Sequence, residues 1–266
     1  MTDRRFTSAR GLRWLARTVW ATRIVDRLYG KFNGLRSRLV LGLGSDAFYD
    51  AFNDITYAGQ PTYRPGSPTF QTELFPWESR IIDAEFPKPP ATVIIGGVGG
   101  GREALALERR GYRVVAFEPA APLATALHHS LDGRQTIEVL VGRYQDLPVL
   151  RSPNGSAAPV DLRPRAPFDA AILGWASFSH IRSDAGRVEA LRQMGALTAG
   201  PIFLSYYSYM EDRASLSAPS GSFAMQVGFF RQLTEAEVRA LVAEAGLDVV
   251  LLKHDDGWPC AVVRRK

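Results

Sequence analysis

The sequence has few of the residues that form disulfides or bind metal ions. Of its 266 residues one is a cysteine, Cys260, which excludes a disulfide framework and a cysteine-rich zinc site. Its four histidines show no metal-ligand spacing such as HExxH. We therefore expect a protein without a metal cofactor.

Long apolar runs are also absent. No run approaches the roughly 20 residues that cross a bilayer. The N-terminal residues MTDRRFTSARG lack the apolar core and the small-residue cleavage site of a secretory signal. Together with the cysteine count, these absences predict a cytoplasmic location in a reducing compartment. Apolar residues still make up 46% of the chain, which is enough for a large core and too many for a disordered protein.

Acidic residues are scarce near the N-terminus, where ten Lys or Arg and one acid, Asp26, lie between Arg4 and Arg38. Residues 8–32 are predicted to be helical, because apolar side chains recur at intervals of three to five residues with arginines between them. A basic amphipathic helix is suited to an anionic membrane surface, so peripheral membrane contact is one interpretation. We favour the commoner case, a helix docked on the domain with its arginine face in solvent.

Residues 42–76 are rich in aromatic side chains and contain four prolines. We predict an irregular segment here, which acts as a lid over a ligand site, as a wrapping segment, or as both. The stretch Pro76–Phe86 predicts a short helix with proline in its first turn. We therefore divide the chain into a helical and irregular N-terminal extension, residues 1–86, and a domain, residues 87–266.

The domain alternates between short apolar runs and helical stretches, which indicates a mostly parallel sheet covered by helices. Strands are predicted at 92–96, 112–117, 136–141, 168–173 and 201–206, and helices at 101–110, 119–131, 184–199 and 234–245. Two further strands, 247–252 and 259–263, have too short a connection for a parallel crossover, so they are antiparallel. We expect an α/β three-layer sandwich with a seven-stranded, mostly parallel sheet and an antiparallel last strand. Loops are predicted at 151–167 and 207–231.

The first predicted strand runs directly into a glycine-rich turn. In TVIIGGVGGGREA, residues 92–104, five glycines fall within six residues and a helical pattern follows. A strand, a glycine turn and a helix N-terminus bring backbone N–H groups up to a ligand, and a Cβ would obstruct its approach. The turn fits both GxGxG and the dinucleotide pattern GxGxxA. This turn alone therefore predicts a nucleotide-like cofactor without identifying it.

An acid, Glu118, follows the second predicted strand. Its carboxylate oxygens can accept hydrogen bonds from ribose hydroxyls, and its charge would repel the 2′-phosphate of NADP. The sequence also contains no GxxxxGK[ST] pattern of the ATP-binding P-loop. NAD and S-adenosylmethionine (SAM) both remain compatible with these residues.

Several stretches, in their order and spacing across residues 91–266, resemble the class I SAM-dependent methyltransferases. They are IIGGVGGGREALAL, VVAFEP, VGRYQDLP, FDAAILGWASFSHI, LTAGPIFLSYY and LTEAEVRALVAEAGLDVV. The resemblance implies a Rossmann-like transferase that moves a methyl group from SAM to an O or N atom of a small-molecule or lipid-like acceptor. Transfer from a sulfonium is an in-line displacement, so the protein must align donor and acceptor and exclude water.

The resemblance also implies a set of cofactor-binding residues. They are Gly97, Val98, Gly99, Gly101, Glu118, Pro119, Tyr144, Asp146, Gly174 and Trp175. Two positions depart from the family pattern: Ile95 replaces the acid before the glycines, and Arg143 replaces the Asp after the third-strand glycine. Something other than residue 95 must therefore hold the turn.

The methyl acceptor is less well defined by the sequence. His180, after the fourth predicted strand, is a candidate catalytic base or substrate contact, and Tyr206 and Tyr207 are candidate substrate-binding residues. We expect a small-molecule acceptor and no nucleic acid, since no patterned aromatic and basic face is present. Two alternatives stay open: a catalytically inactive protein that binds SAM or S-adenosylhomocysteine (SAH), and an NAD-dependent Rossmann enzyme.

Overall fold

The computed structural model divides the chain into two units, Met1–Ser45 and Asp46–Lys266. It describes residues 45–67, 73–131, 133–156, 158–208, 223–225, 229–255 and 258–266, together with eleven positions between 17 and 35, and of residues 46, 223–225, 229, 254 and 255 it describes the backbone alone. The described positions between 17 and 35 are helical, whereas the rest of the predicted 8–32 helix lies outside the described residues. None of the described helices is long and apolar enough to cross a membrane.

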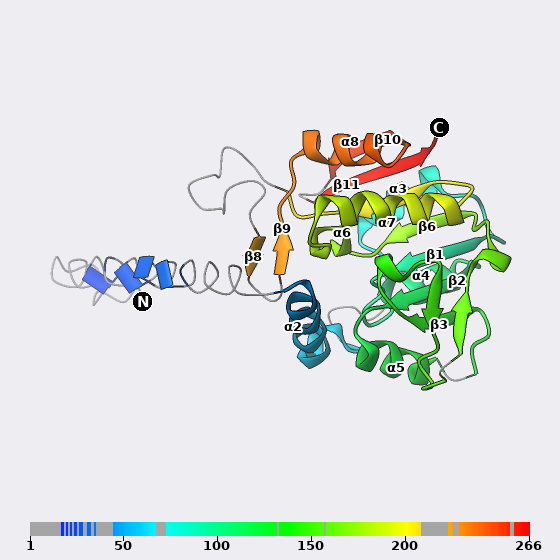
Figure 1. Cartoon of the computed structure of the whole chain (residues 1–266), viewed down its shortest axis with the longest axis horizontal. Coiled ribbons are helices and arrows are strands. Elements are labelled where there is room, and N and C mark those ends of the chain that lie inside the picture. The colour runs from blue at the N-terminus through cyan, green and yellow to red at the C-terminus, as the bar shows by residue number, and fades with distance from the viewer. Residues whose placement is uncertain are drawn as a thin grey trace, which may run out of the picture. The chain divides into compact units, whose positions relative to one another are not determined.

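The sheet of the Asp46–Lys266 unit has a parallel centre and antiparallel ends (Figure 1). The central strands are β1 (Thr92–Gly96), β2 (Arg113–Glu118), β3 (Ile137–Val141), β6 (Ala170–Leu173) and β7 (Ile202–Ser205). Two long strands, β10 (Leu247–Asp255) and β11 (Trp258–Arg265), form an antiparallel pair, and β11 lies antiparallel to β7. The predicted parallel centre and antiparallel finish are confirmed.

The sheet has nine strands, so the predicted count of seven is wrong. The order is β10-β11-β7-β6-β1-β2-β3-β4-β5. The two additional strands, β4 (Val149–Arg151) and β5 (Pro159–Asp161), form an antiparallel extension from β3. Much of this segment was predicted to be a loop, because it is rich in proline. A proline is tolerated at the edge of a sheet, where its missing N–H leaves no ladder position empty.

Helices cover both faces of the sheet and produce three layers (Figure 1). On one face lie α3 (Pro76–Glu85), α4 (Arg102–Arg109) and α5 (Ala121–Ser130), and on the other α7 (Asp184–Leu197) and α8 (Glu235–Glu244). Successive side chains of β1 point to opposite faces of the sheet. Ile94 packs with side chains of α7 and α8, whereas Val93 and Ile95 pack with side chains of α3, α4 and α5. A capping box begins α8: the side chains of Thr234 and Glu237 each accept a hydrogen bond from the other residue's backbone N–H.

Two segments that were predicted to be irregular contain regular structure. Within residues 42–76 the structure has a 14-residue helix, α2 (Asp46–Gly59), followed by a short 3₁₀ turn, Pro61–Tyr63. Within residues 207–231 it has a two-stranded antiparallel sheet, β8 (Phe223–Met225) and β9 (Phe229–Arg231). Both α2 and α3 belong to the Asp46–Lys266 unit.

Candidate functional site

The glycine turn, residues 96–101, follows β1 at the carboxyl end of the parallel strands. The backbone N–H groups of Gly97 and Val98 donate to the Phe117 carbonyl at the end of β2, over 2.8 and 3.2 Å. Ile95 is fully buried among apolar side chains and contributes no polar group to the turn. The end of β2 therefore holds the turn in place of the acid that the resemblance would put at position 95.

Gly99 and Gly174 are needed at the site for different steric reasons. Gly99 has a left-handed φ of +52°, and a Cβ there would meet no protein atom within 4 Å, so it would project into open space. At Gly174, after β6, a Cβ would come within 2.5 Å of the Gly97 carbonyl oxygen. Gly174 thus allows β6 to approach the turn, while Gly99 leaves room for a ligand above it.

Glu118, the last residue of β2, lies beneath this turn and is 7% exposed. One carboxylate oxygen accepts the Gly99 N–H at 2.9 Å and the other accepts the Ala120 N–H at 3.1 Å. Burial raises the pKa of Glu118 to about 7, against the lowering effect of the two backbone hydrogen bonds. Because each carboxylate oxygen has two lone pairs, both can still accept hydrogen bonds from a ligand.

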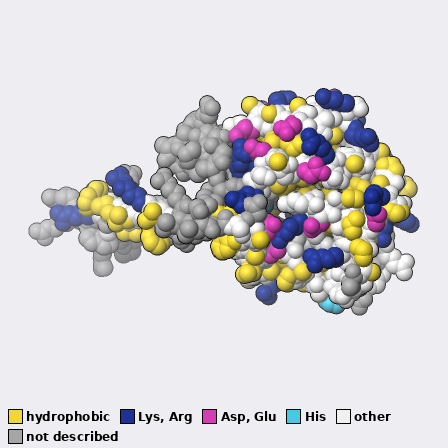
Figure 2. Space-filling model, viewed as in Figure 1, with side chains coloured by type: hydrophobic (Ala, Val, Ile, Leu, Met, Phe, Trp, Pro, Cys, Tyr) yellow, Lys and Arg dark blue, Asp and Glu magenta, His cyan; other side chains and the backbone are white. Residues whose placement is uncertain are grey.

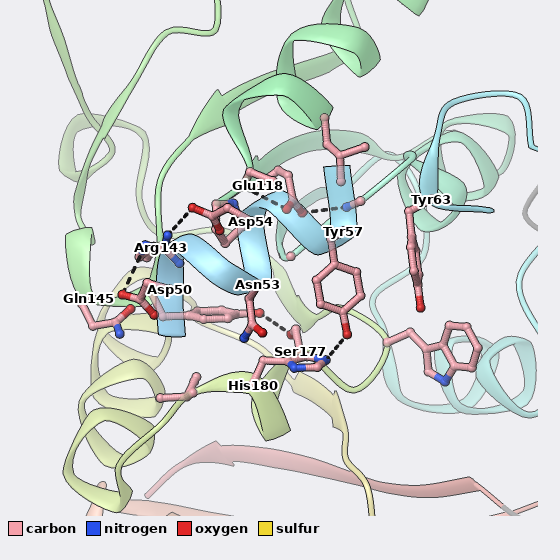
Figure 3. A pocket seen from close by; sticks show the side chains of 18 of the residues that line it. Asp50, Asn53, Asp54, Tyr57, Tyr63, Glu118, Arg143, Gln145, Ser177 and His180 are labelled. Carbon is pink, nitrogen blue, oxygen red and sulfur yellow. Dashed lines mark hydrogen bonds and ion pairs between the residues drawn. The ribbon is translucent and has the colours of Figure 1, made fainter. Parts of the chain in front are cut away.

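A pocket extends from Glu118 to the helix α2 (Figure 3). Its empty space, which includes volume open to solvent, is about 930 Å³. Helix α2 lines it with Asp50, Asn53, Asp54 and Tyr57. These four residues were missed by the sequence analysis, although their i, i+3, i+4, i+7 spacing puts them on one helix face.

Arg143 joins the wall at α2 to the end of β3. Its guanidinium forms an ion pair with Asp54, and its Nε lies 3.6 Å from a carboxylate oxygen of Asp50. Burial raises the pKa of Asp54, and the Arg143 charge acts in the opposite direction. Arg143 stands where the resemblance would place an Asp, and two acids on α2 lie beside its positive charge.

The far side of the pocket is formed by aromatic rings and by a short helix, α6 (Ser177–His180). The Tyr57 hydroxyl lies 2.8 Å from Nε2 of His180. The Tyr207 ring lies 6.1 Å from the His180 ring, measured between centroids. Tyr144 forms a hydrogen bond through its hydroxyl with the Ser177 hydroxyl at 2.6 Å.

The pocket brings together many of the residues predicted from the sequence, and leaves others outside its wall. Those that line it are Gly97, Gly99, Glu118, Pro119, Tyr144, Trp175, His180 and Tyr207. Those outside its wall are Val98, Gly101, Asp146, Gly174 and Tyr206. Asp146 accepts the Arg143 backbone N–H at 2.7 Å and so caps a 3₁₀ turn, and Tyr206 is 1% exposed within the core.

Charged side chains outside the pocket are mixed in sign. On the face in Figure 2, basic and acidic side chains of the Asp46–Lys266 unit are interspersed, without a broad patch of one sign. Among the described residues, no group of three or more His, Cys, Asp or Glu side chains is arranged to hold a metal ion.

Comparison with solved structures shows the fold. The CcbJ methyltransferase from Streptomyces caelestis aligns over 71% of this chain and 88% of its own, with a TM-score of 0.55 and 14% identity. SAM-bound CalS10, an amino pentose methyltransferase from Micromonospora echinaspora, aligns over the same shares with a TM-score of 0.53 and 17% identity. The chain has the class I, Rossmann-like methyltransferase fold.

A protein of another class has a similar fold. A structure named for Zn-dependent alcohol dehydrogenases from Rhodobacter sphaeroides aligns over 82% of this chain and 98% of its own, with a TM-score of 0.57 and 14% identity. No protein-family model matches the sequence. The search of curated proteins also gave no significant match. Function must therefore be argued from the site and not from the fold alone.

Proposed function

We propose that the protein is a SAM-dependent methyltransferase that acts on an O or N atom of a small-molecule acceptor. One observation carries the proposal: the buried carboxyl of Glu118 lies directly beneath a glycine turn that has open space above Gly99. This arrangement suits a ribose, whose two hydroxyls can donate to the carboxylate while the ligand lies close against the glycine backbone. The two aligned methyltransferases support the choice of SAM, because one is described with SAM bound.

The residues present fit this cofactor. Glu118 would accept the ribose hydroxyls, and the Gly97–Gly99 backbone would lie against the rest of the ribose and methionine part. Tyr144 and Gln145 would border the adenine, as the resemblance implies. When bound, SAM supplies a methyl group that is already activated by a positively charged sulfur. The chain itself would align the acceptor and exclude water, a task for which α2 is well placed because it covers the pocket.

Titration calorimetry with SAH and with NAD tests the proposal against the NAD alternative, which the dehydrogenase neighbour keeps open. We expect SAH to bind and NAD to bind far more weakly. The matched variant is Gly99→Asp, whose carboxylate would enter the open space above the turn. Absence of SAH binding, or SAH binding that Gly99→Asp leaves unchanged, would overturn the proposal.

Catalysis is tested separately from binding. The full chain is incubated with methyl-labelled SAM and a cell extract, and labelled small molecules are separated and identified. We expect a labelled product that depends on the protein. Binding of SAH with no labelled product from any extract would favour the catalytically inactive alternative.

A further inference from the structure

The strongest unexplained contact in the pocket joins two residues that are 123 positions apart. The hydroxyl of Tyr57, on α2, lies 2.8 Å from Nε2 of His180, on α6. Both side chains line the pocket, and in Figure 3 the Tyr57 ring lies between Glu118 and His180 with its hydroxyl pointing at the imidazole. A phenol and an imidazole at this distance can pass a proton between them.

The surroundings of Tyr57 determine how such a proton would move. Burial, with smaller effects from Tyr207, Tyr63 and Glu118, raises the pKa of Tyr57 far above its ordinary value. The phenol therefore keeps its proton at neutral pH and can donate it to an unprotonated Nε2. Because a buried phenolate is strongly disfavoured, Tyr57 can give its proton to His180 only as it receives another one from a ligand.

Aromatic rings surround this pair on the side away from the charged residues. The Tyr63 ring lies 4.9 Å from the Tyr57 ring and the Tyr207 ring 6.1 Å from the His180 ring, between centroids. Tyr207 in turn packs at 4.4 Å against Phe230 and at 5.7 Å against Trp258. In Figure 3, Tyr63 and Arg143 lie on opposite sides of Tyr57. The ring-lined side therefore suits a planar and uncharged molecule.

We propose that Tyr57 and His180 are the proton-accepting pair for a phenolic hydroxyl on a planar aromatic acceptor held between these rings. The proposal rests on the proposed methyltransferase function and adds the acceptor class and the reactive pair. As the new O–CH₃ bond forms and the carbon–sulfur bond breaks, the phenolic O–H proton passes to Tyr57 Oη. The Tyr57 proton passes to His180 Nε2, so the products are the methyl ether, SAH and a protonated imidazole, and the total charge is unchanged.

A phenol explains why a pair of this kind is needed. An oxygen nucleophile must lose its proton during transfer, whereas a neutral amine attacks with a lone pair that is already available. A positioned acid–base group contributes about 10²–10⁴ in rate. The pair would also act as a unit, because removing either member interrupts the same proton path.

The first experiment measures ionisation of a bound phenol without any methyl transfer. Umbelliferone is a planar phenol whose neutral and ionised forms have different excitation spectra, and it is added to the SAH-loaded full chain below the pH at which the free dye ionises. We expect the bound dye to be more ionised than the free dye. Tyr57→Phe and His180→Asn should each abolish this increase, and the double variant should give the same result as either single variant. A bound dye that ionises no more than the free dye would overturn the proposed pair.

The second experiment observes the pair directly. Histidine labelled at its ring nitrogens is incorporated into the full chain, and the His180 signals are assigned as those missing from His180→Asn. We expect Tyr57→Phe to move the Nε2 resonance. Tyr112→Phe is the matched control, because the Tyr112 hydroxyl donates to the Pro87 carbonyl at 2.9 Å and does not line the pocket. An Nε2 resonance that is equal in wild type and Tyr57→Phe would contradict the pairing.

The acceptor class is tested with umbelliferone, catechol and quercetin as phenols and with aniline and cyclohexanol as matched controls. We expect the SAH-loaded protein to bind at least one phenol and to bind the controls at least about tenfold more weakly, a difference of about 1.4 kcal/mol. Equal binding of aniline, or no binding of any phenol, would overturn the acceptor class. Loss of SAH binding itself would instead overturn the proposed function, and that measurement needs no acceptor.

Discussion

Arg143 at the end of β3 forms an ion pair with Asp54 in the middle of α2, although the two residues are 89 positions apart. The side chains are 26% and 28% exposed, so the pair is largely screened from bulk water. The pair fastens α2 over the pocket. The family resemblance would place an acid at position 143. This contact makes the wall at α2 part of the candidate cofactor site.

We expect Arg143→Gln to loosen α2 without unfolding the domain. We expect a coupling free energy of only about 1 kcal/mol between Arg143 and Asp54, since ion pairs near the surface contribute about 0–1 kcal/mol. A double-mutant cycle with Asp54→Asn measures it in urea, and hydrogen exchange of the α2 amides should become faster in each single variant. Arg163→Gln is the control, because it breaks the exposed pair with Asp161, far from α2 in the sequence. Unchanged α2 exchange in Arg143→Gln would contradict the fastening role.

Glu118 should make the stability of the ligand-free protein depend on pH. Its pKa is about 7 in the folded protein and close to the ordinary 4.5 when unfolded, because burial is lost. The folded state therefore binds more protons between about pH 4.5 and 7, and the stabilisation is lost as the pH rises through 7. We expect the free energy of unfolding of wild type to fall by a few kcal/mol between about pH 4.5 and 7, and that of Glu118→Gln to stay nearly constant over this range. Urea unfolding across this pH range measures the difference.

The same carboxyl should have the opposite effect on cofactor binding. Ribose hydroxyls need acceptors, and the ionised carboxylate is the better acceptor. We expect the SAH affinity of wild type to rise as the pH increases through about 7, and Glu118→Gln to bind SAH weakly at every pH. An SAH affinity of Glu118→Gln that equals that of wild type would contradict the ribose contact.

The central βα alternation was predictable because its signals are local. A short apolar run, a glycine and a helical period identify β1, α4 and their turn without knowledge of the rest of the chain. The same holds for the capping box of α8. Glu118 could be placed at the site because it directly follows a buried strand, and parallel strands bring their carboxyl ends to one edge of the sheet.

Helix α2 could not be predicted in this way because its polar face points inward. Ile55 is 74% exposed and Phe48 is 45% exposed, while Asp54 and Tyr57 are turned toward the pocket. The usual pattern, in which the apolar face of a helix points inward, therefore predicts no regular helix here. The contacts that justify this orientation, Asp54 with Arg143 and Tyr57 with His180, join distant parts of the chain.

Two glycine variants should separate binding from folding. At Gly99 an added Cβ has space within the protein, so Gly99→Ala should cost about 1–2 kcal/mol for the left-handed backbone and strongly weaken SAH binding. At Gly101 the Cβ would come within 2.4 Å of Leu127, so Gly101→Ala should mainly lower the unfolding free energy. Thermal unfolding and SAH titration of both variants check this. If the loss of SAH affinity relative to the loss of unfolding free energy were similar in both variants, the separate roles of Gly99 and Gly101 would be contradicted.

A chain that begins at Asp46 should bind SAH with the affinity of the full chain. Every described residue that lines the pocket lies in the Asp46–Lys266 unit, and the first of them is Asp50. Flotation with phosphatidylserine vesicles then tests the membrane interpretation of the basic N-terminal segment. If that interpretation holds, the full chain floats, the shortened chain does not, and added salt weakens the effect. Equal behaviour of the two chains would favour the docked interpretation.

Arg102 supports the site from behind the glycine turn. It is 4% exposed and donates to Glu78 at 2.7 Å and to Glu103 at 2.8 Å, and its guanidinium lies 4.2 Å from the centre of the Phe75 ring. One cation thus neutralises two buried carboxylates, one on α3 and one on α4. Burial raises the pKa of Glu78, while the Arg102 charge and hydrogen bond oppose that rise.

Removing the shared cation should cost more than removing one acid. We expect Arg102→Met to lower the unfolding free energy by about 3–5 kcal/mol at neutral pH, because it leaves two buried carboxylates without a partner. Glu78→Gln should cost about 1–3 kcal/mol, since Arg102 still neutralises Glu103. The deficit of Arg102→Met should shrink as the pH falls toward 4.5, because the Glu78 carboxyl can then be buried as a neutral acid. Urea unfolding of both variants at neutral and acidic pH measures these differences, and equal losses for the two variants would show that the cation is not shared.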